Sequence, residues 1–309
     1  MDIRRLELLR ELADRGSVGA VARAAGRTPS AVSQQLKVLE REAGVPLTER
    51  SGRGVVLTDA GRALARTATD IAVAVARAEA LWEDFRHQPS GEVTLATFPT
   101  AAQMLLPGLL DRVAGIPDLT LRASDRDPTS AAFADLTADF DVVIAHSLAG
   151  AGTWRGHGLV IVPLMVEPLD VAMPTDHRLA GRASVGPADL SGEPWIGVPQ
   201  GLPFDRILLD IEQAVGAPAR VVQRVSDTRI TESLVAAGHG IALLPRYTAG
   251  QHEGVVVKRL TGVPAKRHLH VLLRPDRAER PSVRAVVDAL RDEAKAVDAR
   301  VSGSGGSGG

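Results

Sequence analysis

The chain has 309 residues, a formal net charge of −1 at pH 7 and no cysteine. This length suffices for about two or three domains with cores of their own, and the lack of cysteine excludes disulfides, thiolate metal sites and cysteine nucleophiles. Residues 1–5 lack the apolar segment of a signal peptide, and no uncharged apolar run of about eighteen residues occurs. We therefore expect a cytoplasmic protein without a membrane segment.

Residues 17–53 predict two short helices joined by a tight turn. Gly26 stands between the helical patterns, where such a turn needs a positive φ. Thr28 is a suitable N-cap and Pro29 fits the first helical position, so the second helix is expected to start there. Ala22 is small enough for the two helices to cross at close range. This combination is typical of a helix-turn-helix that binds DNA.

The exposed face of the second helix carries hydroxyl and amide side chains, which can reach base edges in the major groove. Between residues 23 and 53, six basic residues stand against three acidic ones, a local excess of +3 that suits a limited number of phosphate contacts. The alternative is an ordinary polar helix followed by a glycine loop. The residues expected to contact DNA are Thr28, Ser30, Ser33, Gln34, Lys37, Arg50 and Arg53.

From residue 2 to about residue 69, the chain resembles the winged helix-turn-helix of LysR-type transcriptional regulators. The matching stretches keep their order and spacing, and they are Ile3–Leu9, Gly16–Val18, Ala22–Ala24, Ser30–Leu36, Leu39–Glu40, Gly44–Arg50 and Leu57–Gly61. One departure is Thr48, where the family usually has an aromatic side chain beneath the wing. The resemblance implies binding to an interrupted inverted repeat in double-stranded DNA, with RNA polymerase as a further partner.

Residues 58–87 predict a long helix with Thr58 as its cap. Its apolar residues recur at alternating spacings of four and three, which is the repeat of a coiled-coil seam. The expected dimerisation seam consists of Leu64, Ala68, Ile71, Val75, Ala78, Trp82 and Phe85. The alternative is a helix that packs only on its own domain. In the family this helix pairs two subunits, so the resemblance implies a homodimer or homotetramer.

After residue 91 strand-like and helical runs alternate, which favours a parallel α/β architecture. Strands are expected at 93–97, 119–123, 142–145, 159–162, 169–173, 195–198, 220–225, 241–244, 255–260 and 269–274, and helices at 101–114, 204–216, 228–238 and 281–299. Ten strands over this length suit two small sheets better than one. The segment resembles the LysR-type effector-binding domain, whose fold is like that of periplasmic binding proteins. The matching stretches are Leu105–Pro107, Glu167–Leu169, His177–Ala180 and Val235–Pro245, and Ala138 replaces a usual turn glycine.

The expected fold is therefore multidomain, of the α+β and α/β classes. It comprises a winged helix-turn-helix domain (1–58), a linker and dimerisation helix (59–88) and a two-lobed α/β effector-binding domain (89–301). The resemblance implies that lobe one combines 91–163 and 266–301, with lobe two at 164–265. Residues 302–309 are a flexible Gly/Ser tail, either an artificial addition or native.

A small-molecule effector is the expected ligand, and no cofactor is expected. In open α/β sheets ligands bind beyond the carboxyl ends of strands, beside helix N-termini. The residues expected there are Thr97, Phe98, Thr100, His146, Gln200 and Thr228. The alternative for each one is a solvated loop residue or a helix cap. The chemical identity of the effector does not follow from these residues.

Catalysis is the competing class of function. No HExxH, GxSxG, Walker A or helix-opening GxGxxG motif occurs. His268 and His270 share one face of a strand, but no nearby Cys, Asp or Glu completes a metal site. A transport binding protein is the third class, and the N-terminal DNA-binding pattern opposes it. We therefore expect neither an enzyme nor a metalloprotein.

Overall fold

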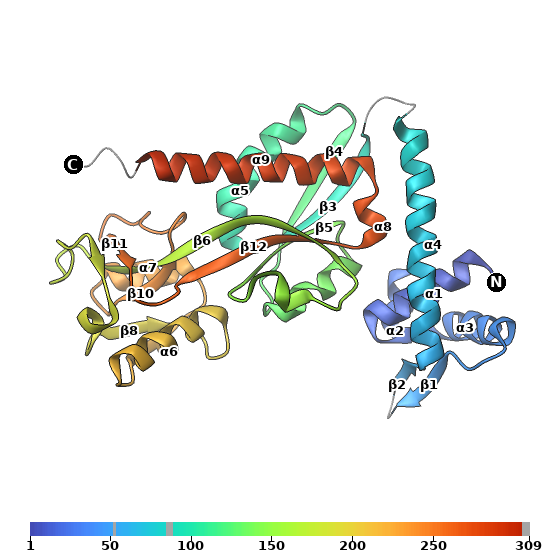
Figure 1. Cartoon of the computed structure of the whole chain (residues 1–309), viewed down its shortest axis with the longest axis horizontal. Helices are drawn as coiled ribbons and strands as arrows, with labels where there is room; N and C mark the ends of the chain where they lie inside the picture. The colour runs from blue at the N-terminus through green and yellow to red at the C-terminus, as the bar shows by residue number, and fades with distance from the viewer. Residues whose placement is uncertain (52–53, 85–88, 305–309) are drawn as a thin grey trace.

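The computed structural model describes residues 1–51, 54–84 and 89–304. Figure 1 shows its parts in chain order: a small helical domain, a long helix that rises from it, and a larger α/β region made of two lobes. The chain crosses between the lobes along two strands, and its last long helix returns over the first lobe.

Helices and a short hairpin make up the N-terminal domain, and the long helix follows directly. The elements are α1 (Ile3–Arg15), α2 (Val18–Ala24), α3 (Pro29–Ala43), β1 (Thr48–Ser51), β2 (Gly54–Leu57) and α4 (Asp59–Asp84). The expected turn and cap are confirmed, because Gly26 has a φ of 60° and the Thr28 hydroxyl accepts a hydrogen bond from the N–H of Ala31 at 3.2 Å. β1 and β2 pair antiparallel and form the wing.

The core of this domain includes the first half of α4. Leu9 of α1 and Leu39 of α3 are fully enclosed. Ala68 of α4 belongs to the same hydrophobic cluster, and Leu64 and Ile71 pack against it. The first half of the long helix is therefore part of the DNA-binding domain's own core.

Lobe one is a mixed sheet in the order β4-β3-β5-β12-β6. β3 is parallel to β4 and β5, whereas β12 is antiparallel to both of its neighbours. α5 and α9 pack on one another and against the sheet. The elements are β3 (Gly91–Thr97), α5 (Pro99–Ala114), β4 (Leu119–Asp125), η1 (Ala131–Phe133), η2 (Asp135–Ala138), β5 (Val142–Ser147), η3 (Gly150–Trp154), β6 (Val160–Pro174), β12 (Lys266–Leu273), α8 (Pro275–Ala278) and α9 (Pro281–Ser304).

Lobe two forms around the far half of β6, which pairs antiparallel with β10 and β11. β8 and β9 pair in parallel, and a single bridge between Trp195 and Ile241 joins them to this lobe's strands. The lobe has its own hydrophobic clusters. The elements are β7 (Ser184–Val185), η4 (Pro187–Leu190), β8 (Pro194–Gly197), α6 (Pro203–Val215), β9 (Arg220–Arg224), α7 (Thr228–Ala236), β10 (Ala242–Pro245) and β11 (Val255–Leu260).

Two expectations about the strands were wrong. The separate strands expected at 159–162 and 169–173 are one strand, β6, which runs through Pro163 and Pro168. The pairing of β6 with β12 shifts register beside Pro163, and such a bulge tolerates a residue without an N–H. Because β6 pairs with strands of both lobes, the sheet is continuous between them. Its mixed strand directions replace the expected parallel order.

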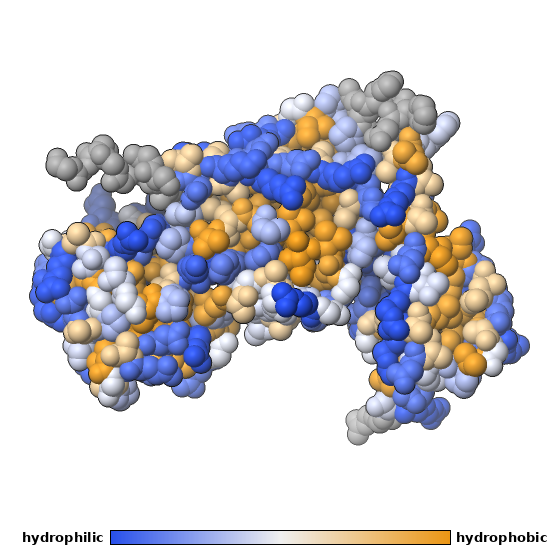
Figure 2. All heavy atoms as spheres, viewed as in Figure 1, coloured by the Kyte–Doolittle hydropathy of each residue, from blue (hydrophilic) through white to orange (hydrophobic). Residues whose placement is uncertain are grey.

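The surface is mostly hydrophilic along the helices. Figure 2 shows polar side chains along α9 and apolar ones gathered below it, over the sheet in the middle of the molecule. Val75 and Leu81 of α4 are 41% and 65% exposed, which leaves an apolar strip on that helix. No helix within the described ranges combines the length and hydropathy needed to cross a membrane.

Candidate nucleic-acid interface and effector cleft

Helix α3 presents the polar face that the sequence predicts. Val32, Leu36 and Leu39 point into the domain core, which leaves the opposite face to solvent. The residues on or capping this helix are Thr28, Ser30, Ser33, Gln34 and Lys37, and all of them except the half-buried Ser33 are exposed. Arg50 is exposed on the wing strand β1, and Arg53 lies outside the described residues. The hydroxyls of Thr28 and Ser30 lie 3.0 Å apart where the helix begins.

The wing is tied to α3 by Glu40, a role that the sequence analysis missed. One carboxylate oxygen of Glu40 accepts hydrogen bonds from the N–H of Leu47 at 3.0 Å and from the N–H and hydroxyl of Thr48, both at 2.8 Å. Thr48 is the position where an aromatic residue was expected from the family. Here a polar contact, instead of packing, fixes the start of the wing, and the polar Thr48 was the available signal.

The C-terminal ends of β3 and β5 bring together the four effector residues expected in lobe one. Thr97, Phe98, Thr100 and His146 are 2%, 1%, 7% and 7% exposed. The ring centroids of Phe98 and His146 lie 4.4 Å apart. These residues meet because the carboxyl ends of parallel strands share one edge of a sheet.

Arg267 stands at the centre of this group and was not predicted. Its guanidinium donates to Glu167 from Nε at 2.8 Å and from Nη2 at 2.6 Å, and Nη2 also donates to the Thr100 hydroxyl at 2.7 Å. The guanidinium carbon lies 4.9 Å from the ring centre of Phe98 in lobe one and 5.6 Å from that of Phe204 in lobe two. Arg267 therefore contacts the first turns of α5 and α6, which belong to different lobes. Charged residues inside mostly apolar strands were the signal that could have found this pair.

His146 is a neutral group in an apolar cage. Burial lowers its pKa from the ordinary 6.5, and Asp127, whose carboxylate is 3.8 Å away, offsets only part of this effect. Its ring also meets Phe133 edge-on, and its Nδ1 has no hydrogen-bond partner among the described residues. Within the same residues, no group of three His, Asp or Glu side chains could hold a metal ion.

The lobe-two residues expected at the cleft lie apart from this group. Gln200 is exposed in the loop between β8 and α6. Thr228, the first residue of α7, lines a cavity of about 20 Å³ beside Phe204 and Ser226. Phe204 is thus a lobe-two residue that the structure brings to the lobe-one group.

The two halves of the expected dimerisation seam have different environments. Leu64, Ala68 and Ile71 pack in the domain's own core, as described above. Val75 is 41% and Trp82 is 68% exposed, and Ala78 is exposed as well. Phe85 lies outside the described residues. Among the described residues, the second half of the seam is therefore more exposed than the first.

Comparison with known families matches nearly the whole chain. Residues 3–62 match the bacterial regulatory helix-turn-helix protein of the lysR family, and residues 86–295 match the LysR substrate binding domain. A hydrogen peroxide-inducible genes activator of Dickeya chrysanthemi is 27% identical over 296 residues, which are 94% of this chain and 95% of that protein. The HTH-type transcriptional activator IlvY of Salmonella typhimurium is 29% identical over 280 residues, or 89% and 90% of the two chains.

Solved structures share the fold over the full length. A full-length OxyR variant from Pseudomonas aeruginosa has a TM-score of 0.62 at 20% identity, covering 94% of this chain and 98% of its own. Full-length CbnR in complex with its target DNA has a TM-score of 0.55 at 23% identity, covering 95% and 100%. The arrangement of domain, long helix and two lobes is therefore common to these proteins.

Proposed function

This chain belongs to the LysR family of DNA-binding transcriptional regulators, and from that premise we propose which of its residues contact DNA and which receive the effector. The chain has a helix-turn-helix domain followed by an effector-binding domain. We propose that α3 enters the major groove with Ser33 and Gln34 facing base edges. Thr28, Ser30, Lys37, Arg50 and Arg53 then contact phosphates and set the register. The exposed polar face of α3 carries this proposal.

The protein acts as a homodimer or a pair of dimers, through the exposed half of α4. Val75, Ala78 and Trp82, continued by Phe85, form the seam, while Leu64, Ala68 and Ile71 support each DNA-binding domain from within. A two-fold pair of α3 helices reads an interrupted inverted repeat. RNA polymerase is a further partner, and the protein works in the cytoplasm. In this proposal residues 1–58 bind DNA, 59–88 form the linker helix whose second half pairs, and 89–301 bind the effector.

The effector is a small molecule that binds between the lobes, and the protein does not catalyse a reaction of it. Thr97, Phe98, Thr100 and His146 form its lobe-one side, and Gln200 and Thr228 close over it from lobe two. Arg267 supports this assignment, because it already touches helix starts from both lobes. A ligand bound unequally by open and closed lobes shifts the regulator between two DNA-binding states.

Thiol oxidation is not the signal. Several relatives are named hydrogen peroxide-inducible genes activators. This chain has no cysteine, so a sulfenic acid or disulfide cannot form within it.

The test is sequencing of genomic fragments captured by the full-length protein. The matched control carries Ser33→Ala and Gln34→Ala, which leave the core of α3 intact. Enrichment of fragments that share an interrupted inverted repeat, lost in the control, supports the function and the assigned face. An equal set of fragments for both proteins would contradict the assigned face. No enrichment at low salt, with and without added cell metabolites, would contradict the proposed function.

A further inference from the structure

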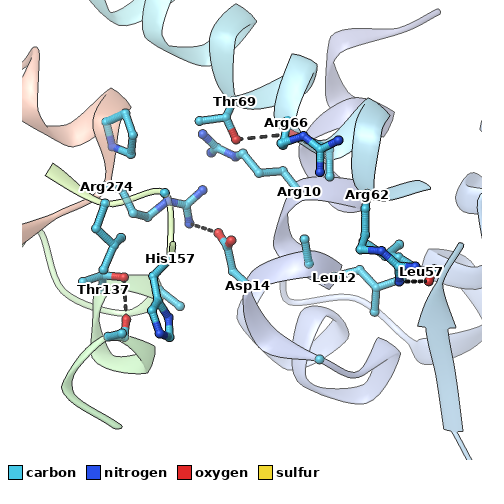
Figure 3. Close-up of a pocket in the computed structure, with 18 of the residues that line it drawn as sticks. Arg10, Leu12, Asp14, Leu57, Arg62, Arg66, Thr69, Thr137, His157 and Arg274 are labelled. Atoms are coloured by element: carbon cyan, nitrogen blue, oxygen red, sulfur yellow. Dashed lines mark hydrogen bonds and ion pairs between the residues drawn. The ribbon is translucent and has the colours of Figure 1, made fainter. Parts of the chain in front are cut away.

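The DNA-binding domain is docked on lobe one of its own chain. Arg274, which caps α8 directly after β12, points its Nη1 at the carboxylates of Glu11 and Asp14 on α1, at 2.8 and 3.1 Å. Figure 3 shows Arg274 and Asp14 facing one another across the boundary between the two domains. Arg10 of α1 is paired with Asp276 of α8 at 2.9 Å. We call these five residues the α1–α8 cluster.

Two further ion pairs extend the same contact. Arg15 at the end of α1 donates to Asp139 at 2.6 Å and to the carbonyl of Ala138 at 2.7 Å, both beside η2. Arg77 of α4 donates to Glu279 at 3.0 Å. The contact thus joins two helices of the DNA-binding part to two separate segments of lobe one.

Burial distinguishes the α1–α8 cluster from ordinary surface ion pairs. Arg274 is 5% and Arg10 is 7% exposed, so both guanidinium groups have left water. Burial by itself opposes ionisation of Glu11, but hydrogen bonds from Arg274 and Arg15 outweigh it, and the pKa of Glu11 falls below its usual value. Both partners therefore keep their charges at neutral pH, and the attraction between them holds the domains together.

The cluster is nevertheless incompletely satisfied. Nε of Arg10 and Nη2 of Arg274 are buried without a hydrogen-bond partner in the part of the chain that is described. Beside the cluster, a cavity of about 1150 Å³ lies between the DNA-binding domain and lobe one. Burying charged groups with unmade hydrogen bonds costs free energy, which offsets part of the charge attraction. A ligand that binds the docked and undocked arrangements unequally can shift the balance between them.

Strand β12 connects this cluster to the effector cleft. Arg267 lies near the start of β12 and Arg274 follows its end, seven residues on. At about 3.3 Å per residue, the strand spans roughly 23 Å between them. It is hydrogen-bonded on both sides, to β5 and to β6, and its register with β6 shifts between Leu269 and His270. One strand therefore carries a residue of the lobe-one group, Arg267, and leads directly to a residue of the α1–α8 cluster, Arg274.

We propose that the α1–α8 cluster is an intrachain latch, through which lobe one fixes the DNA-binding domain and the effector cleft alters its position by way of β12. Its regulatory consequence rests on the proposed function, whereas the latch itself does not. The DNA-binding domain is then connected to lobe one both by the linker helix and by the α1–α8 cluster.

The absence of cysteine allows a direct measurement of the latch. Ala25→Cys in the DNA-binding domain and Thr120→Cys in lobe one are exposed positions outside the cluster, and spin labels on both report the distance between domains. Labelled full-length chain is mixed with excess unlabelled chain, so that each measured distance lies within one chain. Arg274→Gln is expected to lengthen and broaden the distance distribution. Arg274→Lys, which keeps the charge, and Arg178→Gln, which removes an exposed ion pair in lobe two, are expected to match the parent.

An unchanged distribution in folded Arg274→Gln would overturn the proposal. If that variant does not fold, Asp14→Asn replaces it, because its side chain is 37% exposed and it removes a single partner. No shift in Asp14→Asn would equally overturn the latch. A shift in either variant, with the parent distance in the Arg178→Gln control, supports it.

The regulatory consequence is tested on a captured DNA fragment. Arg274→Gln is expected to change affinity about fivefold or more, the lower range of allosteric coupling, with an unchanged salt dependence, because no phosphate contact is lost. Unchanged affinity despite a shifted distance would overturn the transmission through β12. A parent protein that binds no DNA would contradict the proposed function, while the distance measurement would still decide the latch.

Discussion

The guanidinium of Arg267 lies 2.6 Å from the carboxylate of Glu167, and the two residues are 2% and 0% exposed. They are direct partners in the antiparallel pairing of β12 with β6, the two strands that pass between the lobes. The second oxygen of Glu167 accepts the N–H of Tyr247 at 3.1 Å. A buried ion pair, with both carboxylate oxygens of Glu167 accepting hydrogen bonds, therefore stands where the two strands cross between the lobes.

Removing one partner of this pair should be costly. Arg267→Met leaves Glu167 buried without its cation, and we expect the free energy of unfolding to fall by about 3 kcal/mol. Combining it with Glu167→Gln should recover part of this loss. Urea denaturation measures both variants, and Arg229→Gln, which removes an exposed pair, should stay within about 0.5 kcal/mol of the parent. Equal effects for Arg267→Met and Arg229→Gln would contradict this account.

Stability should fall as the pH drops below the ordinary pKa of histidine. The pKa of His146 lies below 6.5 in the folded protein because the ring is buried, so near that pH the unfolded chain binds a proton that the folded chain does not. The resulting stabilisation is complete above the unfolded pKa and is lost as pH falls through it. The pKa of His270 is lowered by burial too and adds to the trend.

The variant His146→Leu tests how much His146 contributes to this pH dependence of stability. Because Nδ1 has no hydrogen-bond partner to lose, we expect the free energy of unfolding of this variant to be close to that of the parent at about pH 7.5. Between that pH and about pH 5.5, the variant should lose about 1 kcal/mol less stability than the parent. Chemical denaturation at the two pH values gives the comparison, with His239→Gln, an exposed histidine, as control. A His146→Leu variant with the parent's pH dependence would show that this imidazole is not responsible.

Variants in α3 and in the wing should distinguish contacts to base edges from contacts to the DNA backbone. Gln34→Ala should cost about 1–3 kcal/mol on the preferred sequence and relax the base preference. Arg50→Ala should weaken binding to all sequences and reduce the salt slope by about one, and we expect the same of Arg53→Ala. Competition binding at several salt concentrations distinguishes these patterns. Unchanged sequence preference in Gln34→Ala would place the reading face elsewhere.

The wing should depend on Glu40. Glu40→Ala removes the acceptor of three hydrogen bonds, two of them from backbone N–H groups, so we expect about 2 kcal/mol less stability in the DNA-binding domain. Weaker wing contacts should accompany this loss. Glu40→Gln keeps one oxygen and should retain most of the stability. Hydrogen exchange at the N–H groups of Leu47 and Thr48 measures the change, and unaltered protection in Glu40→Ala would refute it.

Local patterns were sufficient for the DNA-binding part. The Gly26 turn, the Thr28 cap and the inward Val32, Leu36 and Leu39 were read from neighbours in the chain and appear as expected. Caps and helical periodicity act within a few residues, so a single sequence contains them. The same holds for most strands of the two lobes, where short apolar runs end at turn residues.

Tertiary structure decided the contacts between residues far apart in the chain. Whether 159–162 and 169–173 are two strands or one depends on β12, whose register beside Pro163 absorbs the irregularity. Arg267 meets Glu167 a hundred residues away, and Arg274 meets Glu11 across 263. The first half of α4 is occupied by its own domain, although its apolar repeat equally fits a partner. Sequence by itself determined whether most segments are helix, strand or turn. Which distant charge lies opposite another depends on strand register and domain docking, for which local periodicity carries no signal.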